Sequence, residues 1–248
     1  MKAYALTDIG RVRQMNQDAQ YASTEPVGPL SNLFLVADGM GGHRAGDYAS
    51  RYLVEHLPEY IKESEKTDAV AALRDAISRV NLELYELASE REELSGMGTT
   101  LVAAVIEGDT LYAANIGDSR LYLIEKGGIR QVTKDHSYVE EMVSMGQMER
   151  ESQEYKQQKN IITRAVGIEP KVEADFFEVP LESGDYILLC SDGLSNMVDN
   201  SSIFRLVLLP GTLQTKATAL AALANQNGGK DNIAVVLVEP ERSEVRHT

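Results

Sequence analysis

Residues 99–133 have the sequence TTLVAAVIEGDTLYAANIGDSRLYLIEKGGIRQVT. Apolar and β-branched residues dominate this stretch, and Gly108-Asp109 and Gly127-Gly128 interrupt it where hairpin turns are expected. The pattern therefore predicts three or four strands joined by tight turns. Such connections favour antiparallel sheets, because a parallel sheet needs a longer crossover between successive strands.

Elements on both sides of this stretch complete an α+β pattern. Strands are predicted at residues 2–6, 33–37, 172–179, 186–190 and 233–238, and helices at about 45–61 and 213–226. The strand at 33–37, LFLVA, is apolar on both faces, so we expect it at the centre of a sheet. The helices fall in two separate blocks rather than alternating with strands. We therefore predict helices packed outside a β-sandwich.

One further helix is long and amphipathic. Its predicted N-cap is Thr67, with Asp68 in the first turn, where a carboxylate favours the exposed amides. Apolar residues recur at three-four spacing from Val70 to Leu87, so one stripe of this helix must be buried. By contrast, residues 137–158 are polar and rich in Met, Glu and Gln, and we expect them to be helical or mobile rather than core.

The chain is predicted to form a single domain over residues 1–248. It contains no internal repeat, no low-complexity stretch and no Pro/Gly/Ser-rich linker. Hydrophobic residues make up 43% and charged residues 25%, which is ordinary for a globular protein with a substantial core. We expect a monomer.

Charge and cysteine content narrow the function classes. The net charge of −14 argues against a nucleic-acid partner, because phosphate backbones require a basic surface. Cys190 is the only cysteine, so no intramolecular disulfide exists and a reducing compartment is expected. The N-terminal sequence MKAYALTDIG lacks the apolar core of a signal peptide, and apolar runs such as 233–238 are too short to span a bilayer. These features predict a cytoplasmic protein without membrane insertion.

The most informative chemical motif is VADGMGGH at residues 36–43. An apolar strand ends there in Asp38, and three glycines follow that permit close backbone approach. A carboxylate beside a free carbonyl suits a hard divalent cation, which prefers oxygen ligands. An Asp-Gly turn without any ligand is an equally good interpretation of this motif taken alone.

The same construction recurs three times. Asp192-Gly193 follows the apolar strand at 186–190, Asp231 directly precedes the strand at 233–238, and Gly117-Asp118 lies between two strands. Each aspartate alone could be a turn residue. Four carboxylates that converge at one rim of a sandwich would repel one another unless cations lie among them, so their joint occurrence favours a metal cluster.

Two more acids and an arginine lie near the N-terminus, at Asp8, Asp18 and Arg13. An arginine beside a metal cluster is suited to bidentate binding of a phosphate or carboxylate. For a lone arginine, a surface ion pair is the simpler interpretation.

Taken in order, the motifs resemble a known family. They are Arg13, Asn16-Gln17-Asp18, Asp38-Gly39-Met40-Gly41-Gly42-His43, Gly96-Met97-Gly98-Thr99-Thr100, Gly117-Asp118-Ser119-Arg120, Asp135-His136-Ser137, Thr163-Arg164-Ala165-Val166-Gly167, Ser191-Asp192-Gly193 and Asp231-Asn232. This set is similar to that of the PPM family, the metal-dependent type 2C serine/threonine phosphatases, with spacing like the bacterial branch. The resemblance covers essentially the whole chain and implies a four-layer α-β-β-α sandwich of two antiparallel sheets flanked by helix pairs.

The resemblance also implies roles for individual residues. It assigns Asp38 to bridge two Mn²⁺ or Mg²⁺ ions, with the Gly39 carbonyl on one of them and Asp192 and Asp231 completing the protein ligands of the other. Asp118, together with Asp192, would hold a third ion. Asp18 would orient metal-bound water, and Arg13 would bind the substrate phosphate.

The implied reaction is hydrolysis of phosphoserine and phosphothreonine in proteins. A hydroxide that bridges the two cations would attack phosphorus in line, without a phosphoenzyme. The expected partners are phosphorylated proteins, including a serine/threonine kinase that the enzyme opposes. Cys190 is expected to be a packed core residue rather than a nucleophile.

The chain departs from the pattern of eukaryotic family members at a position that is a candidate for the general acid. Eukaryotic members often have histidine directly after the Asp-Gly pair, where this chain has Met40. His43 is a candidate for the role, with a hydrogen-bonding or capping histidine as the alternative, and metal-bound water is a further candidate. We interpret His136 as mainly structural. By this resemblance, residues 143–159 correspond to the family's flap, a mobile subdomain beside the active site that is expected to gate or select substrates. Their polar composition indicates few core contacts.

Two other functions fit the same residues. One is a different metallohydrolase, such as a phosphodiesterase or a small-molecule phosphatase, which relative rates on phosphopeptides and phosphodiesters would distinguish. The other is a catalytically dead binding module on this fold. Missing acidic residues would indicate such a module, and all the expected ligands are present.

Overall fold

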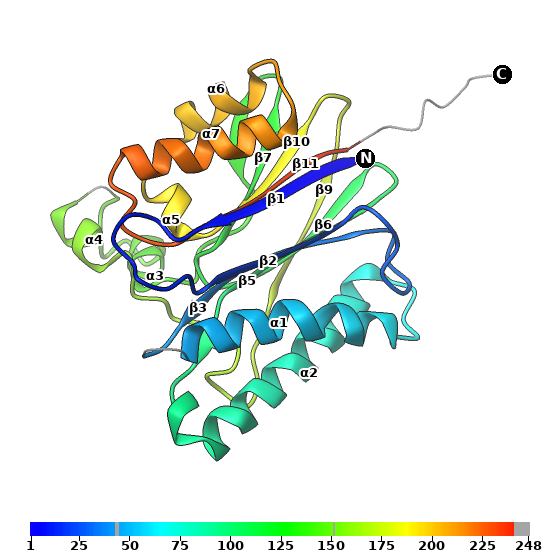
Figure 1. Ribbon diagram of the computed structural model, residues 1–248, viewed down its shortest axis with the longest axis vertical. Helices are drawn as coiled ribbons and strands as arrows, with labels where there is room; N and C mark the ends of the chain where they lie inside the picture. The colour runs from blue at the N-terminus through cyan, green and yellow to red at the C-terminus, as the bar shows by residue number, and fades with distance from the viewer. Residues whose placement is uncertain (43–44, 151, 241–248) are drawn as a thin grey trace.

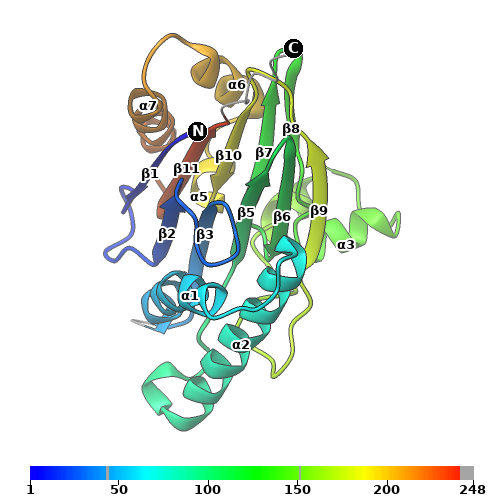
Figure 2. The ribbon, with the colours of Figure 1, turned by 90° about the vertical axis from the view of Figure 1, so that its right-hand side faces the viewer.

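The computed structural model describes residues 1–42, 45–150 and 152–240. Two antiparallel sheets form its centre, and helices cover the outer face of each (Figure 1, Figure 2). In spatial order, one sheet contains β1 (Lys2–Asp8), β11 (Ile233–Glu239), β10 (Tyr186–Cys190), β7 (Arg120–Glu125) and β8 (Gly128–Gln131). The other contains β2 (Asp18–Ser23), β3 (Leu33–Met40), β5 (Leu101–Glu107), β6 (Thr110–Ile116) and β9 (Asp175–Pro180), with β4 (Gly98–Thr99) paired to the end of β3.

The helices form two groups. On one side of the sandwich lie α1 (Ala45–Lys62), α2 (Ala69–Glu90) and the short 3₁₀ helix η1 (Glu92–Leu94). On the other side lie α5 (Asp192–Ser195), α6 (Asn200–Leu208) and α7 (Leu213–Gln226). Two short helices, α3 (Tyr138–Ser144) and α4 (Gln153–Gln158), project beside α5.

Alternating side chains fill the spaces between these layers. In β3, Leu33 and Leu35 pack toward α1 and α2, whereas Phe34 and Val36 pack between the two sheets. β11 has the same period of two between the inter-sheet core and the core beneath α6 and α7. Apolar side chains on both faces of these strands account for a four-layer arrangement, and the predicted α-β-β-α sandwich is confirmed.

Several predicted elements match the structure closely. The strand at 186–190 and the helix at 213–226 have the predicted bounds. The stretch at 99–133 forms β5 to β8 as four strands, and 33–37 is the core of the central strand β3. The first turn lies at Gly108-Asp109 as predicted, whereas the second lies at Lys126-Gly127, one residue before the predicted position, because Gly128 already pairs with Glu125 in β8. The polar segment at 137–158 contains α3 and α4, so the expectation of helix there is confirmed.

Two predicted boundaries are wrong. Asp68, not Thr67, caps α2, because the Asp68 Oδ1 atom accepts a hydrogen bond from the Ala71 amide at 2.7 Å. The strand predicted at 172–179 begins at Asp175, which pairs with Asn115 in the last register position before β6 ends at Ile116. Residues 172–174 therefore lie outside the β6–β9 ladder.

No helix in the described part of the chain is long and apolar enough to cross a membrane.

Candidate metal centre

The ends of central strands bring the predicted acidic residues together at one rim of the sandwich. Asp38 lies near the end of β3, and Asp118 lies in the turn between β6 and β7. Asp192 and Asp231 flank the neighbouring strands β10 and β11. All four line one cavity of about 270 Å³, together with Gly39, Arg13, Gln17, Met40, Gly41, Thr100, Asn160, Ile162 and Asn232.

Asp18 lies behind this cavity. It stands opposite Asp38 in the β2–β3 ladder and is 7% exposed. The Ser191 hydroxyl donates a hydrogen bond to Asp18 Oδ2 at 2.6 Å, which ties β2 to the end of β10 across the two sheets. The structure thus places Asp18 beside the predicted ligands rather than on the cavity wall.

Close backbone packing fixes the position of Asp38. A Cβ atom on Gly39 would lie 2.0 Å from the Gly46 carbonyl oxygen, so only glycine permits this approach of α1 to the end of β3. The Asp38 amide donates to the Thr100 hydroxyl at 2.9 Å, and the Asp38 carbonyl accepts from the Thr100 amide at 2.9 Å. The carboxylate of Asp38 is therefore presented from a rigid backbone.

Burial and mutual repulsion raise the pKa values of these carboxyl groups. Burial is the largest cause in each case, and neighbouring aspartates add to it. The pKa of Asp18 is raised to about 8, that of Asp118 to about 7 and that of Asp192 to about 6. The pKa of Asp38 is raised well above its ordinary value. Such a cluster is electrostatically unfavourable in its ionised form unless cations neutralise it.

The donor set fits hard divalent cations. Oδ1 of Asp18 and Oδ1 of Asp192 are buried without a hydrogen-bond partner, so each carboxylate keeps one oxygen that no protein donor occupies. Within residues 1–42, 45–150 and 152–240, no three His, Cys, Asp or Glu side chains are arranged closely enough to hold one metal ion by themselves. An open arrangement of few carboxylates suits ions that keep several water ligands, as Mg²⁺ does.

The raised pKa values predict how the stability of the metal-free protein depends on pH. Asp18 and Asp118 bind protons more tightly when folded than when unfolded, so stability should fall as pH rises from about 4 to about 8. Burial lowers the pKa of His136, which has the opposite effect below about pH 6.5, so the carboxyl groups dominate between about 6.5 and 8. Thermal unfolding of EDTA-treated protein at pH 6.5 and 8 measures this trend. A melting temperature that stays flat or rises across this window would contradict it.

Arg13 lies at the mouth of the cavity, where it is half exposed. One of its guanidinium nitrogens donates to Asp231 Oδ2 at 2.7 Å. The ion pair considered from the sequence is therefore present, but its partner is a predicted metal ligand rather than an unrelated surface acid. This contact places the guanidinium beside the acidic cluster.

Asn232 positions the loop that carries Arg13. Its side-chain amide donates to the carbonyls of Ile9 and Met15, both at 2.9 Å, and its Oδ1 accepts from the Gln17 amide at 2.8 Å. Ser191, Thr100 and Asn232 were all members of sequence motifs, but the motifs gave no contact partners for them. The positioning roles of these three residues were therefore missed.

The remaining chemical candidates have mixed outcomes. Cys190 is fully buried, so the prediction of a packed core cysteine is confirmed, and burial raises the pKa of its thiol to about 12. His136 accepts from the Gly117 amide at 3.1 Å through Nδ1 and contacts Asp175 through Nε2, as a structural histidine would. Met40 lines the cavity. His43 lies outside the described residues, and its role stays a prediction.

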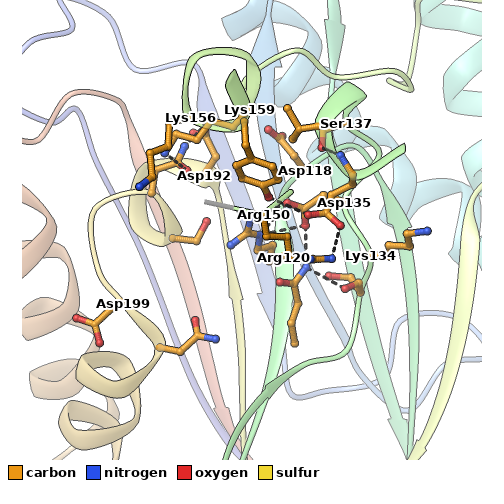
Figure 3. Close-up of a pocket in the computed structure, with 18 of the residues that line it drawn as sticks. Asp118, Arg120, Lys134, Asp135, Ser137, Arg150, Lys156, Lys159, Asp192 and Asp199 are labelled. Carbon is orange, nitrogen blue, oxygen red and sulfur yellow. Dashed lines mark hydrogen bonds and ion pairs between the residues drawn. The ribbon is translucent and has the colours of Figure 1, made fainter. Parts of the chain in front are cut away.

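A second cavity of about 770 Å³ adjoins the first, and Asp118 and Asp192 line both (Figure 3). Its wall includes residues of α3, α4 and the segment that joins them. Glu140 holds α3 and α4 together. Its carboxylate accepts hydrogen bonds from the Arg150 guanidinium at 2.6 Å and from the hydroxyl of Tyr155, in α4, at 2.8 Å. The predicted flap at 143–159, of which residue 151 is not described, thus borders the acidic cluster.

Comparison with known proteins connects this geometry to a family. Residues 10–232 match the family model for protein phosphatase 2C. The chain belongs to the protein phosphatase 2C family. This membership confirms the family predicted from the motifs, and with it the enzyme class, protein-serine/threonine phosphatase.

Relatives of this phosphatase match over nearly their whole length. Serine/threonine phosphatase stp of Listeria monocytogenes is 42% identical over 247 residues, which cover 96% of each chain. Protein phosphatase PhpP of Streptococcus pneumoniae is 41% identical over 243 residues, 96% of this chain and 97% of its own.

Solved structures show the same fold. A bacterial serine phosphatase superposes with a TM-score of 0.90 at 36% identity, covering 99% of this chain and 100% of that one. The catalytic domain of the serine/threonine protein phosphatase PstP, solved in complex with two manganese ions, has a TM-score of 0.83 at 34% identity. That match covers 95% of this chain and 96% of the PstP chain.

Proposed function

We propose that this phosphatase hydrolyses phosphoserine and phosphothreonine in proteins with the aid of a pair of Mn²⁺ or Mg²⁺ ions. The observation that carries the proposal is the cluster of buried aspartates at the sandwich rim, whose carboxyl pKa values are raised by burial and by one another. The PstP neighbour with two manganese ions supports the choice of metal. The matching relatives, named as serine/threonine phosphatases, support the substrate class.

In this proposal each acidic residue has a defined role. Asp38 would hold both ions of the pair, the Gly39 carbonyl would contribute to one, and Asp192 and Asp231 would contribute to the other. Asp118 and Asp192 would hold a third, weaker ion. When bound, the pair supplies a water of lowered pKa as nucleophile and positive charge for the phosphoryl transition state, so no phosphoenzyme forms.

The other residues of the chain position these groups. Asp18, fixed by the Ser191 hydroxyl, orients water beside Asp38. Arg13 exchanges its contact with Asp231 for the substrate phosphate, which a guanidinium can bind through two parallel hydrogen bonds. Thr100 keeps the Asp38 backbone in place during turnover. We further propose that the enzyme opposes a serine/threonine kinase and acts as a monomer in the cytoplasm.

The test is hydrolysis of phosphoserine and phosphothreonine peptides by EDTA-treated protein, with and without added Mn²⁺, beside a phosphodiester of matched leaving group. Mn²⁺-dependent release of phosphate from the peptides, well above the rate on the diester, is the expected result. A higher rate on the diester would favour a phosphodiesterase instead.

Arg13→Ala should raise KM for p-nitrophenyl phosphate by about tenfold and change kcat less, because a bidentate phosphate contact also forms in the ground state. Arg11→Ala is the matched control, since Arg11 lies in the same loop but does not line the cavity. Steady-state kinetics at saturating Mn²⁺ measure both parameters. An unchanged KM with ordinary kcat would place Arg13 outside the substrate site.

A further inference from the structure

Asn196 connects a predicted metal ligand to the segment that contains α4. It lies one helical turn after Asp192 and caps the C-terminus of α5, so both side chains lie on the same face of that turn. Its Nδ2 donates to Asp192 Oδ2 at 2.9 Å. Its Oδ1 accepts from the Lys159 ammonium at 2.8 Å. Lys159 and Asp192 lie on the same side of the larger cavity (Figure 3).

These two hydrogen bonds define the orientation of the amide. A lysine ammonium has only donors, so it must face the amide oxygen, and the amide nitrogen must then face Asp192. Asp192 Oδ2 is thereby occupied by a donor from its own chain. Oδ1 of the same carboxylate is buried and has no partner, which leaves it as the free oxygen.

We propose that Lys159 and Asn196 form a clamp that holds the Asp192 carboxylate with Oδ1 directed to a cation. The inference rests on the proposed function only in taking Asp192 as a metal ligand. Neither residue lines the smaller cavity with Asp38, so both are positioning residues. Hydrogen-bonding partners of this kind typically change metal affinity by about 10- to 100-fold when removed.

The clamp also joins two parts of the chain. Lys159 directly follows α4, and the next residue, Asn160, lines the smaller cavity. Asp192 lies at the start of α5 and lines the same smaller cavity as Asn160. A displacement of the α4 segment would therefore release the Asn196 amide and, through it, the Asp192 carboxylate.

The first test measures Mn²⁺ affinity by titration calorimetry on the full-length, EDTA-treated chain. Asn196→Ala should weaken Mn²⁺ binding at the ion of the pair that Asp192 is proposed to hold with Asp231 by about tenfold or more, and high Mn²⁺ should restore kcat with KM for p-nitrophenyl phosphate unchanged. The matched control is Asn200→Ala, which lines the same cavity without a contact to Asp192. Unchanged Mn²⁺ affinity in a folded Asn196→Ala protein would overturn the clamp.

Lys159 needs a double-mutant cycle, because its charge also acts on the site directly. Removing a cation near the cluster strengthens Mn²⁺ binding, whereas releasing the amide weakens it. In the Asn196→Ala background only the first effect remains. We therefore compare the factor by which Lys159→Met changes Mn²⁺ affinity in the two backgrounds. This factor should be at least about twofold larger in the Asn196→Ala background than in the wild type.

The cycle has a matched control and distinct outcomes. Lys134→Met removes the same charge from the far side of the same cavity, and it should show no coupling to Asn196 (Figure 3). Additive effects of Lys159→Met and Asn196→Ala would overturn the clamp while leaving Asp192 as a ligand. A wild-type chain that binds no Mn²⁺ would instead overturn the proposed function.

Discussion

Asp38→Asn is expected to lower kcat on phosphopeptides by about 10²- to 10³-fold, the size of effect seen when preorganised electrostatic stabilisation is removed from an active site. Asparagine keeps the shape of the side chain, but it replaces the proposed anionic ligand of both cations with a neutral amide. No other acidic side chain in the described part of the cavity extends from β3. The loss should therefore persist at high Mn²⁺.

The fold should tolerate this substitution. The Asp38 backbone is held by Thr100 and by Gln17, whose carbonyl accepts from the Gly39 amide at 3.0 Å, and none of these contacts uses the carboxylate. Because neighbouring aspartates repel the Asp38 charge, the metal-free variant should be at least as stable as the wild type at neutral pH.

The measurements are thermal unfolding in EDTA and phosphate release with Mn²⁺. Asp75→Asn, an exposed acid on α2, is the matched control for a lost carboxylate. Near-normal Mn²⁺-dependent rates in a stable Asp38→Asn protein would refute the metal assignment.

The sequence predicts well where these acidic residues lie, because their positions at strand ends depend on the local sequence pattern. An apolar strand that ends in Asp-Gly directs its carboxylate to a strand end, and central strands of two packed sheets can end at the same rim. Asp38 and Asp192 both follow this rule, and Asp231 follows it in reverse at the start of β11. The long-range arrangement then follows from the four-layer fold.

Other features were not predictable because they depend on tertiary contacts. β2, with the sequence DAQYAS, has little apolar alternation, and its pairing with β3 is what places Asp18 opposite Asp38. Helix α6 was missed for a similar reason, since its short sequence NSSIFRLVL buries only Ile203 and Val207. Asp199 caps this helix through the Ser202 amide, a signal that the sequence did contain.

Contacts between distant side chains were the least accessible to sequence reasoning. The Arg13–Asp231 pair joins residues 218 positions apart. The Lys159–Asn196 hydrogen bond depends on how the α4 segment lies against α5. Motif order indicates which residues belong to the site, whereas these contacts hold the carboxylates of Asp231 and, through Asn196, of Asp192.

Asp118→Ala tests the third cation. The turn that carries Asp118 is fixed by its neighbours, because the Gly117 carbonyl accepts from the His136 amide at 2.9 Å and the Gly117 amide donates to His136 Nδ1. Alanine should therefore leave the backbone in place. Asp118 is assigned to the third ion alone, so calorimetry should find two Mn²⁺ ions retained and one weaker ion lost.

The kinetic consequence should depend on the leaving group. A serine alkoxide needs protonation as it departs, whereas p-nitrophenolate is stable as an anion. If the third ion assists this protonation, Asp118→Ala should lower kcat by about tenfold or more on phosphoserine peptides and by clearly less on p-nitrophenyl phosphate. Asp38→Asn serves as the reference, since it should reduce both rates alike. Three ions still bound, or equal losses on both substrates, would count against this role for Asp118.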